Sequence, residues 1–118
     1  MILEPSGLKA LVARIRKAGY VSLDTETDNI SPTRARLVGM SFALEPGEAF
    51  YLPLRHDYLG APAQIPIAAA LSLLRPVLEA PKIRKIGQNI KYDLIVLKRE
   101  GIDLQGLDED TMILSYLL

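Results

Sequence analysis

The stretch that decides the fold is residues 20–54, YVSLDTETDNISPTRARLVGMSFALEPGEAFYLPL. At its start, Val21 and Leu23 alternate with side chains that are small or polar, among them Asp24 and Glu26. Alternation with a period of two is typical of a β-strand that has one buried and one exposed face. Residues 20–26 are therefore predicted to form a strand that carries its carboxylates on the exposed face.

Two more strands are predicted in the rest of this stretch. Residues 27–36 are rich in turn-forming types, and the apolar, β-prone segments 37–44 and 49–54 follow. Only Glu-Pro-Gly-Glu separates these two segments, and a short Pro-Gly connection indicates a hairpin. Because short turns join consecutive strands in antiparallel fashion, we expect three antiparallel strands.

Helical patterns flank these strands. Apolar residues of segment 8–15 recur at helical spacing, and Ser6 and Gly19 are suited to begin and end that helix. A second helix is predicted to start near Pro66, with a kink at Pro76 because proline removes a hydrogen-bond donor.

The remaining residues alternate between strand and helix. Segment 82–87 is predicted to be a short strand, 89–100 a helix, 102–107 an edge strand, and a last helix is expected from Asp110. Strands joined through helices run parallel. The predicted fold is therefore α/β, a single domain with a mixed five-stranded sheet, three antiparallel strands and then two parallel ones, flanked by helices.

Composition excludes several classes of function. The chain has 118 residues, with 14 Lys and Arg, 14 Asp and Glu, one histidine (His56) and no cysteine. It therefore has no disulfide, thiolate zinc site or cysteine nucleophile, and a Ser-His-Asp triad is disfavoured. Zero net charge argues against a general clamp on duplex nucleic acid. No apolar segment is long enough to span a membrane, and the expected location is the cytoplasm.

Asp24 and Glu26 are the first candidate site. Residues i and i+2 of a strand lie on the same face, about 6.5–7 Å apart along it. Their oxygens could converge on a divalent cation. The alternative is a solvated strand end, since Glu26/Asp28 and Asp108/Asp110 have the same spacing.

Asn89 and Asp93 are the second candidate pair. They lie at i and i+4, on the same side of the predicted third helix, beside its apolar stripe. The alternative is that Asn89 caps the helix and that Asp93 is a first-turn acid favoured by the helix dipole.

Several segments together resemble a known family. The chain is similar to the 3′–5′ proofreading exonuclease domain of bacterial DNA polymerase I, within the DEDD exonuclease superfamily, whose fold is ribonuclease-H-like. The likeness covers almost the whole chain, in order, through VSLDTETD (21–28), LVGMSFALEPGEAFYLPL (37–54), HDYLGAP (56–62), IGQNIKYD (86–93) and DTMILSYLL (110–118).

The resemblance implies a catalytic centre. Asp24 and Glu26 match the first exonuclease motif, as direct metal ligands, and Asp93 matches the second. The cofactors implied are two divalent cations, Mg²⁺ or Mn²⁺, which act by the two-metal logic of in-line displacement. The substrate implied is a single-stranded 3′ DNA end.

The resemblance also suggests contacts with the nucleic acid. Ile30 matches an apolar wedge near the terminal bases, and the backbone of Thr25 could approach the terminal nucleotide. Asn89 corresponds to the asparagine of the second motif, and Lys91 and Tyr92 could pair with or stack on the strand. The alternatives are a turn-flanking Ile30, a solvated Lys91 and a Tyr92 packed in the core.

One motif of the family is missing. No Tyr-x-x-x-Asp follows Asp93 in this sequence. We therefore expect a C-terminally incomplete domain with little or no activity, cut from a longer polymerase polypeptide that is an active editor. Two alternatives remain: a non-catalytic module that binds single-stranded nucleic acid or shapes a polymerase, and an RNA-processing exonuclease of the same superfamily.

Overall fold

The computed structural model describes residues 1–29, 31 and 33–108. Its centre is a mixed sheet with strand order β3-β2-β1-β4. The strands are β1 (Tyr20–Thr27), β2 (Leu37–Ala43), β3 (Phe50–Pro53) and β4 (Arg84–Ile86). β1, β2 and β3 pair in antiparallel fashion, and β4 runs parallel to β1, as the sequence predicts.

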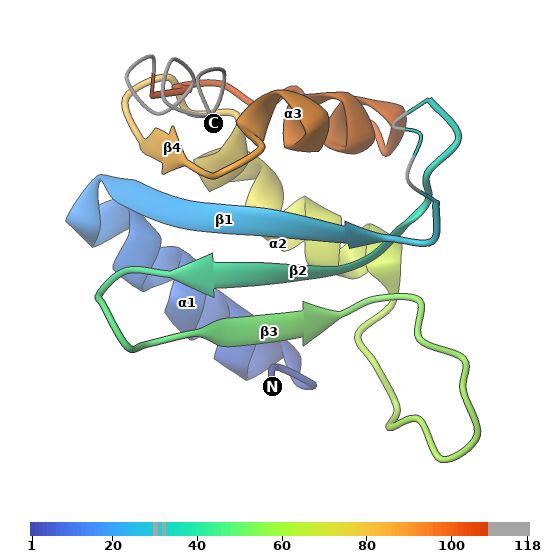
Figure 1. Cartoon of the computed structure of the whole chain (residues 1–118). Helices are drawn as coiled ribbons and strands as arrows, with labels where there is room; N and C mark the ends of the chain where they lie inside the picture. Colours follow the sequence, from blue (N-terminus) through green and yellow to red (C-terminus); the bar gives the residue numbers. More distant parts are fainter. Residues whose placement is uncertain (30, 32, 109–118) are drawn as a thin grey trace.

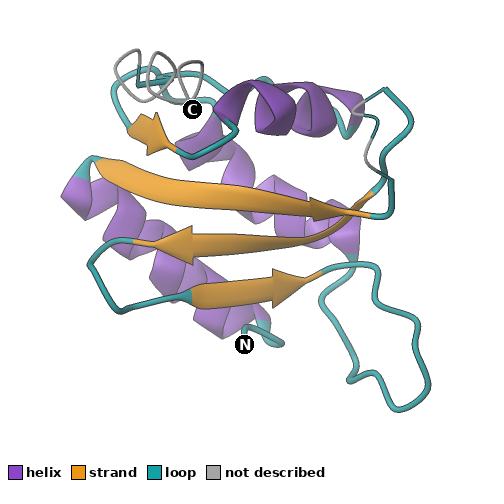
Figure 2. Ribbon diagram, viewed as in Figure 1, coloured by secondary structure: helices purple, strands orange, loops and turns teal. Residues whose placement is uncertain are grey.

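Three helices accompany the sheet. They are α1 (Pro5–Ala18), α2 (Ile67–Leu78) and α3 (Ile90–Arg99). α1 and α2 cover the same face, whereas α3 lies beside β1 at the edge that β4 occupies only in part (Figures 1 and 2). Among the described residues no helix covers the other face of the sheet, which faces the viewer in Figure 1.

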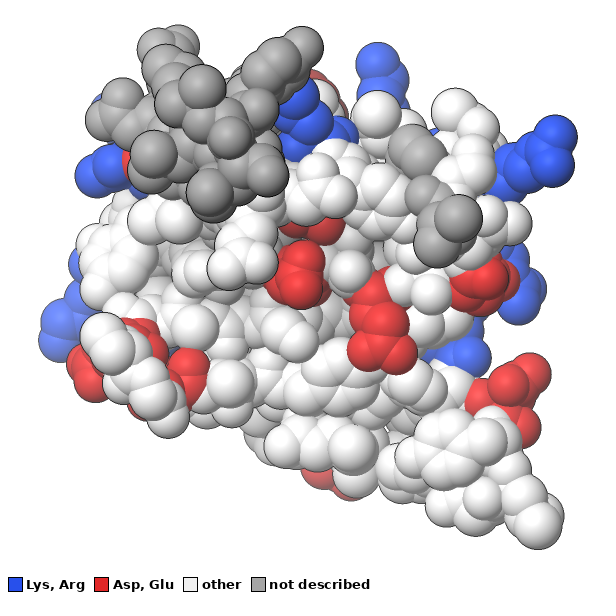
Figure 3. All heavy atoms as spheres, in the orientation of Figure 1, with Lys and Arg blue, Asp and Glu red and all other residues white. Residues whose placement is uncertain are grey.

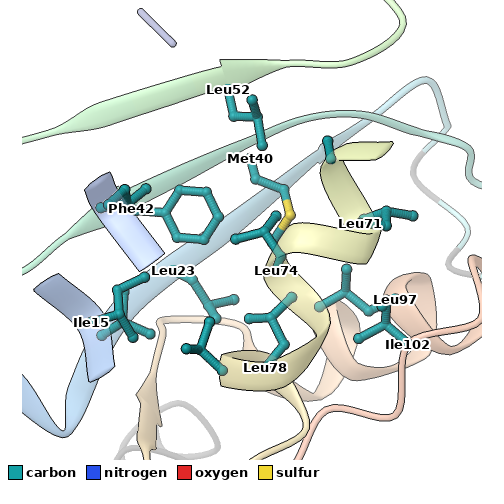
Figure 4. Packing of buried hydrophobic residues seen from close by; sticks show 14 of the residues in the cluster. Ile15, Leu23, Met40, Phe42, Leu52, Leu71, Leu74, Leu78, Leu97 and Ile102 are labelled. Atoms are coloured by element: carbon teal, nitrogen blue, oxygen red, sulfur yellow. The ribbon is translucent and has the colours of Figure 1, made fainter. Parts of the chain in front are cut away.

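The hydrophobic core lies between the sheet and the helices α1 and α2. Figure 4 shows Ile15, Leu23, Phe42 and Leu74 converging there from α1, β1, β2 and α2. Each of these side chains is at most 3% exposed. The core therefore fixes which face of β1 is buried, and with it the face on which the intervening polar residues stand.

The helix starts differ in detail from the prediction. α1 begins at Pro5, with Glu4 at the N-cap position and no capping side-chain hydrogen bond, so Ser6 is not its cap. Proline suits the first turn because its missing N–H has no intrahelical partner there. Gly19 ends α1 as predicted, with φ 79°. α2 contains Pro76, but the kink expected there stays a prediction.

The predicted fifth strand is wrong for the described part of the chain, which has four strands. Leu107 makes one isolated parallel bridge to Lys85. The N–H groups of Asp103 and Gln105 instead donate to the Glu79 carboxylate and the Leu78 carbonyl, at the end of α2. These bonds divert the segment from a sheet ladder. The helix expected from Asp110 lies outside the described residues.

No helix in the part of the chain that the structure describes is both long and apolar enough to cross a membrane.

Candidate active site

Asp24 and Glu26 lie on the open face of the sheet. Along β1, Val21 and Leu23 are buried, whereas Asp24 and Glu26 are exposed, as the alternation predicts. On β2, Ser41 is the register partner of Asp24. Figure 3 shows acidic side chains over the middle of this face, with Lys and Arg at its periphery.

Asp93 is bound to the edge of β1. The pairing of β4 with β1 ends at Ser22, so no described strand pairs with Thr25 on that side. The Asp93 carboxylate occupies this unpaired position at the edge of β1. Its Oδ1 accepts hydrogen bonds from the Thr25 N–H at 3.1 Å and from the Thr25 hydroxyl at 2.6 Å. The second candidate thus lies directly beside the first.

The segment between β4 and α3 allows this close approach. A Cβ on Gly87 would lie 2.9 Å from the Leu23 carbonyl oxygen, closer than real Cβ atoms come, and 3.2 Å from the Ile90 side chain, which is an unusually tight contact. The buried side chains of Ile90 and Leu97 hold α3 against the core. Glycine at 87 therefore lets the first turn of α3 bring Asp93 to β1.

The Asp93 carboxyl is in an unusual environment. The residue is 1% exposed, and its Oδ2 has no hydrogen-bond partner among the described residues. Burial raises the pKa of Asp93 to about 6, the nearby Asp24 adds to the rise, and the Thr25 hydrogen bonds oppose it. This buried, unpaired oxygen is a site that a cation or a proton would stabilise.

Asp24 couples electrostatically to both other acids. Partial burial raises its pKa, and the negative charge of Glu26 raises it further. Because Asp24 in turn raises the pKa of Asp93, charge repulsion runs along the series Glu26, Asp24, Asp93. Bound divalent cations would relieve this repulsion, and oxygen-only ligands suit Mg²⁺ or Mn²⁺.

The side chains are not gathered around one point. Within residues 1–29, 31 and 33–108, no three carboxylate or imidazole groups lie close enough to hold one metal ion. Glu26 is bonded elsewhere, because its Oε2 accepts a 2.8 Å hydrogen bond from the Tyr51 hydroxyl. The donor set therefore has the chemistry of a divalent-metal site, with Glu26 turned toward β3.

Tyr51 and His56 are neighbours of the site that the sequence interpretation did not include. His56 Nε2 lies 2.7 Å from the Tyr51 hydroxyl and 4.0 Å from Glu26 Oε1. The usable signal was the hairpin register, which puts Tyr51 opposite Ser41 and hence on the face of the carboxylates. The predicted loop at residues 55–64 is otherwise as expected.

The residues predicted to contact nucleic acid divide into two groups. Asn89 and Tyr92 line a cavity of about 510 Å³ with the end of β1. The Tyr92 hydroxyl donates to the Asn29 carbonyl at 2.9 Å, and its ring packs partly against the core. Asn89 occupies the N-cap position of α3 but makes no capping side-chain hydrogen bond.

The other predicted contacts are Thr25, Lys91 and Ile30. The N–H and hydroxyl of Thr25 are already bonded to Asp93. Lys91 is exposed on α3. Ile30, the predicted wedge, lies outside the described residues. A second hollow, of about 330 Å³, includes Asp24 and Ser41 on the open face of the sheet.

The whole chain, residues 1–118, matches the family described as 3′–5′ exonuclease. It is also 42% identical, over 120 residues, to DNA polymerase I of Pseudomonas aeruginosa. The chain belongs to the 3′–5′ exonuclease family of DNA polymerase I. The match covers 100% of this chain but 13% of that relative, so the chain spans about an eighth of the polymerase.

Solved exonuclease structures have the same fold. The catalytic core of RRP6 from Trypanosoma brucei has a TM-score of 0.68 at 19% identity and covers 90% of this chain and 27% of that one. Escherichia coli RNase D, described as an exoribonuclease involved in structured RNA processing, has a TM-score of 0.58 at 22% identity, with 91% and 27% covered. At such identities the likeness shows the fold alone.

Proposed function

We propose that this chain supplies the first two metal-binding motifs of a proofreading 3′–5′ exonuclease within a bacterial DNA polymerase I. The activity is hydrolysis of the terminal phosphodiester at a single-stranded 3′ DNA end, in the cytoplasm. The observation that carries the proposal is the Asp93 carboxylate, which is buried beside Asp24 with one oxygen unpaired. Family membership supports the same activity.

Asp24, Glu26 and Asp93 are the residues that would hold the divalent cations. When bound, two Mg²⁺ or Mn²⁺ ions supply water activation and charge compensation for in-line displacement at phosphorus. Thr25 orients Asp93 through its N–H and hydroxyl, which leaves Oδ2 as the available donor atom. Glu26, whose side chain is 54% exposed, would offer Oε1 to a cation while its Oε2 accepts the hydrogen bond from Tyr51.

The DNA strand is proposed to pass beside the end of β1. The cavity lined by Asn89 and Tyr92 offers an amide and an aromatic ring to a nucleotide. Lys91, which precedes Tyr92 in the chain, is exposed and can approach a phosphate. Thr25 and Ile30 are proposed as further contacts with the terminal nucleotide.

The 118-residue chain by itself is proposed to have little or no activity. It contains no Tyr-x-x-x-Asp after Asp93, so it lacks the carboxylate and tyrosine that the family uses to complete the site. On its own it would behave as a non-catalytic module that holds metal or single-stranded DNA weakly. We propose that the active form is the longer polymerase polypeptide.

The test is a nuclease assay on the full-length polypeptide. With Mg²⁺ and a single-stranded DNA labelled at its 5′ end, we expect stepwise shortening from the 3′ end. Asp24→Asn should reduce the rate by about 10³-fold, because metal ligation contributes several kcal/mol of transition-state stabilisation. Asp57→Asn, in the exposed loop, is the matched control. No shortening by the wild-type protein would contradict the proposal.

An RNA-processing exonuclease is the second candidate, because the fold that the chain shares with E. coli RNase D does not by itself separate DNA from RNA substrates. A matched RNA strand in the same assay separates the two. A clear preference for the DNA end supports the polymerase role, and a preference for RNA would overturn it.

A further inference from the structure

Tyr51 reaches Glu26 across an entire strand. Tyr51 is on β3, Glu26 is on β1, and β2 lies between them (Figure 1). The phenol nevertheless donates a 2.8 Å hydrogen bond to Glu26 Oε2. Direct pairs on a sheet join neighbouring strands, so a side-chain bond that passes over a middle strand needs a gap in the intervening row of side chains.

Gly39 on β2 provides that gap. It is the register partner of Glu26 on one side and of Pro53 on the other. A Cβ at position 39 would overlap the Tyr51 hydroxyl and lie 2.6 Å from Tyr51 Cζ. Gly39 is not among the glycines with positive φ, so its backbone conformation does not require glycine. The tightest contacts are with the phenol ring lying over it, and the Leu52 carbonyl oxygen follows at 3.2 Å.

His56 holds the other side of the Tyr51 hydroxyl. That hydroxyl has one hydrogen, which it donates to Glu26, so toward His56 Nε2, 2.7 Å away, it can only accept. The imidazole must therefore carry its proton on Nε2.

Gln64 fixes the loop that carries His56. Its side-chain oxygen accepts from the His56 N–H at 2.9 Å, and its side-chain nitrogen donates to the His56 carbonyl at 2.8 Å. The backbone of His56 is thus held at both polar groups by one amide. The result is a continuous series of hydrogen bonds from the loop, through His56 and Tyr51, to Glu26.

We propose that Tyr51, lying over Gly39 and held by His56, is a positioning residue that fixes the Glu26 carboxylate for cation binding. The inference rests on the proposed function of Glu26 as a metal ligand. Because Tyr51 engages Oε2, Oε1 is left as the oxygen available to the cation. The two tightest contacts of a Cβ at position 39 would be with the Tyr51 phenol, so Gly39 acts on Glu26 by way of Tyr51.

The first experiment needs neither metal nor activity. In the metal-free full-length polypeptide, ¹H–¹⁵N NMR of His56 should show an Nε2–H proton that exchanges slowly with solvent. Tyr51→Phe and Gly39→Ala should each remove this protection, because each abolishes the contact with the phenol oxygen. Tyr20→Phe, which loses a phenol bond to Leu44 elsewhere on the sheet, should leave it intact.

The second experiment measures Mn²⁺ affinity and nuclease kinetics in the same protein. Tyr51→Phe should weaken Mn²⁺ binding and lower kcat by about 5-fold each, the effect of one partly exposed hydrogen bond to a charged group. KM for DNA and the melting temperature should stay unchanged. Gly39→Ala should lower Mn²⁺ affinity and kcat by the same factor. The double variant, Gly39→Ala with Tyr51→Phe, should lose no more of either than a single variant does. Gly7→Ala, where a Cβ would make an ordinary 3.5 Å contact, is the control for glycine.

The outcomes separate this inference from the proposed function. An Nε2–H that exchanges freely in the wild-type protein, or a Tyr51→Phe variant with unchanged Mn²⁺ affinity and kcat, overturns the positioning role. Additive losses in the double variant overturn the route from Gly39 through Tyr51. If wild-type protein shows the protected proton but does not shorten DNA, the function fails while the hydrogen-bond series stands.

Discussion

The two outer carboxylates of the site, Asp93 and Glu26, are held in contrasting ways on either side of Asp24. On the α3 side, Asp93 is 1% exposed and is bound by the main-chain N–H and the hydroxyl of Thr25. On the β3 side, the Glu26 side chain is 54% exposed and accepts a hydrogen bond from the Tyr51 phenol.

The difference shows how one site can combine a buried and an exposed ligand. A buried charge with an unpaired oxygen costs folding free energy, so the α3 side is coupled to the stability of the whole chain. A partly exposed carboxylate costs little, so the β3 side affects geometry without affecting stability. Substitutions on the two sides should therefore differ in what they change.

The largest effect on stability is expected from Asp93→Asn. The folded pKa of about 6 lies above the usual 3.8, so the folded state keeps its proton longer than the unfolded state as the pH rises. Stability of the wild type should then fall by about 3 kcal/mol between roughly pH 4 and pH 7. Urea unfolding of Asp93→Asn should not show that loss, whereas Asp57→Asn should behave as wild type. Parallel pH profiles of the wild type and Asp93→Asn would contradict the assignment.

Gly87→Ala tests the close approach that brings Asp93 to β1. The new Cβ would lie 2.9 Å from the Leu23 carbonyl, a backbone atom with little freedom to move. We expect destabilisation by about 1–3 kcal/mol, as for other overpacked buried positions. Thermal unfolding measures it, with Gly7→Ala as the control. If the Gly87→Ala protein is as stable as wild type, the contact between position 87 and the Leu23 carbonyl has room for a Cβ, which would contradict this account.

Thr25→Val tests the hydrogen bonding of Asp93 on the same side of the site, and its effect on stability should be smaller. Valine keeps the N–H bond to Asp93 but removes the 2.6 Å hydroxyl bond. The free energy of unfolding should fall by about 1 kcal/mol. Because the Thr25 bonds oppose the rise, the Asp93 pKa should increase further. Carboxyl ¹³C titration by NMR measures the pKa, and a lower value in the variant would refute the role of the hydroxyl.

The smallest effect on stability is expected on the β3 side. Tyr51→Phe removes a bond to a carboxylate that is itself half exposed. The free energy of unfolding should change by no more than about 0.5 kcal/mol. Urea unfolding beside Thr25→Val gives the direct comparison. A loss from Tyr51→Phe larger than that from Thr25→Val would reverse the ranking of the two sides.

Much of this arrangement is readable from local patterns. The alternation of Val21, Leu23, Asp24 and Glu26 predicts which face of β1 carries the acids. The i, i+4 spacing of Asn89 and Asp93 places Asp93 beside the apolar stripe of α3. These predictions succeed because strand and helix periodicities are local and the core fixes their phase.

The rest depends on where elements end and how strands are registered. That Thr25 binds Asp93 follows from the pairing of β4 stopping at Ser22, which no local pattern contains. That Tyr51 reaches Glu26 depends on the register of three strands and on Gly39. The predicted fifth strand fails for a similar reason, since the N–H groups of Asp103 and Gln105 find partners at the end of α2.

The central claim is that carboxylates from β1 and from α3 serve the same cations. Paramagnetic broadening by Mn²⁺ in ¹H–¹⁵N NMR spectra of the protein tests it most directly. Substoichiometric Mn²⁺ should broaden the amide signals of Asp24, Glu26 and Asp93 together, and Asp93→Asn should weaken the broadening at all three. Broadening of the β1 signals that leaves Asp93 sharp, or that persists unchanged in Asp93→Asn, would contradict a shared site.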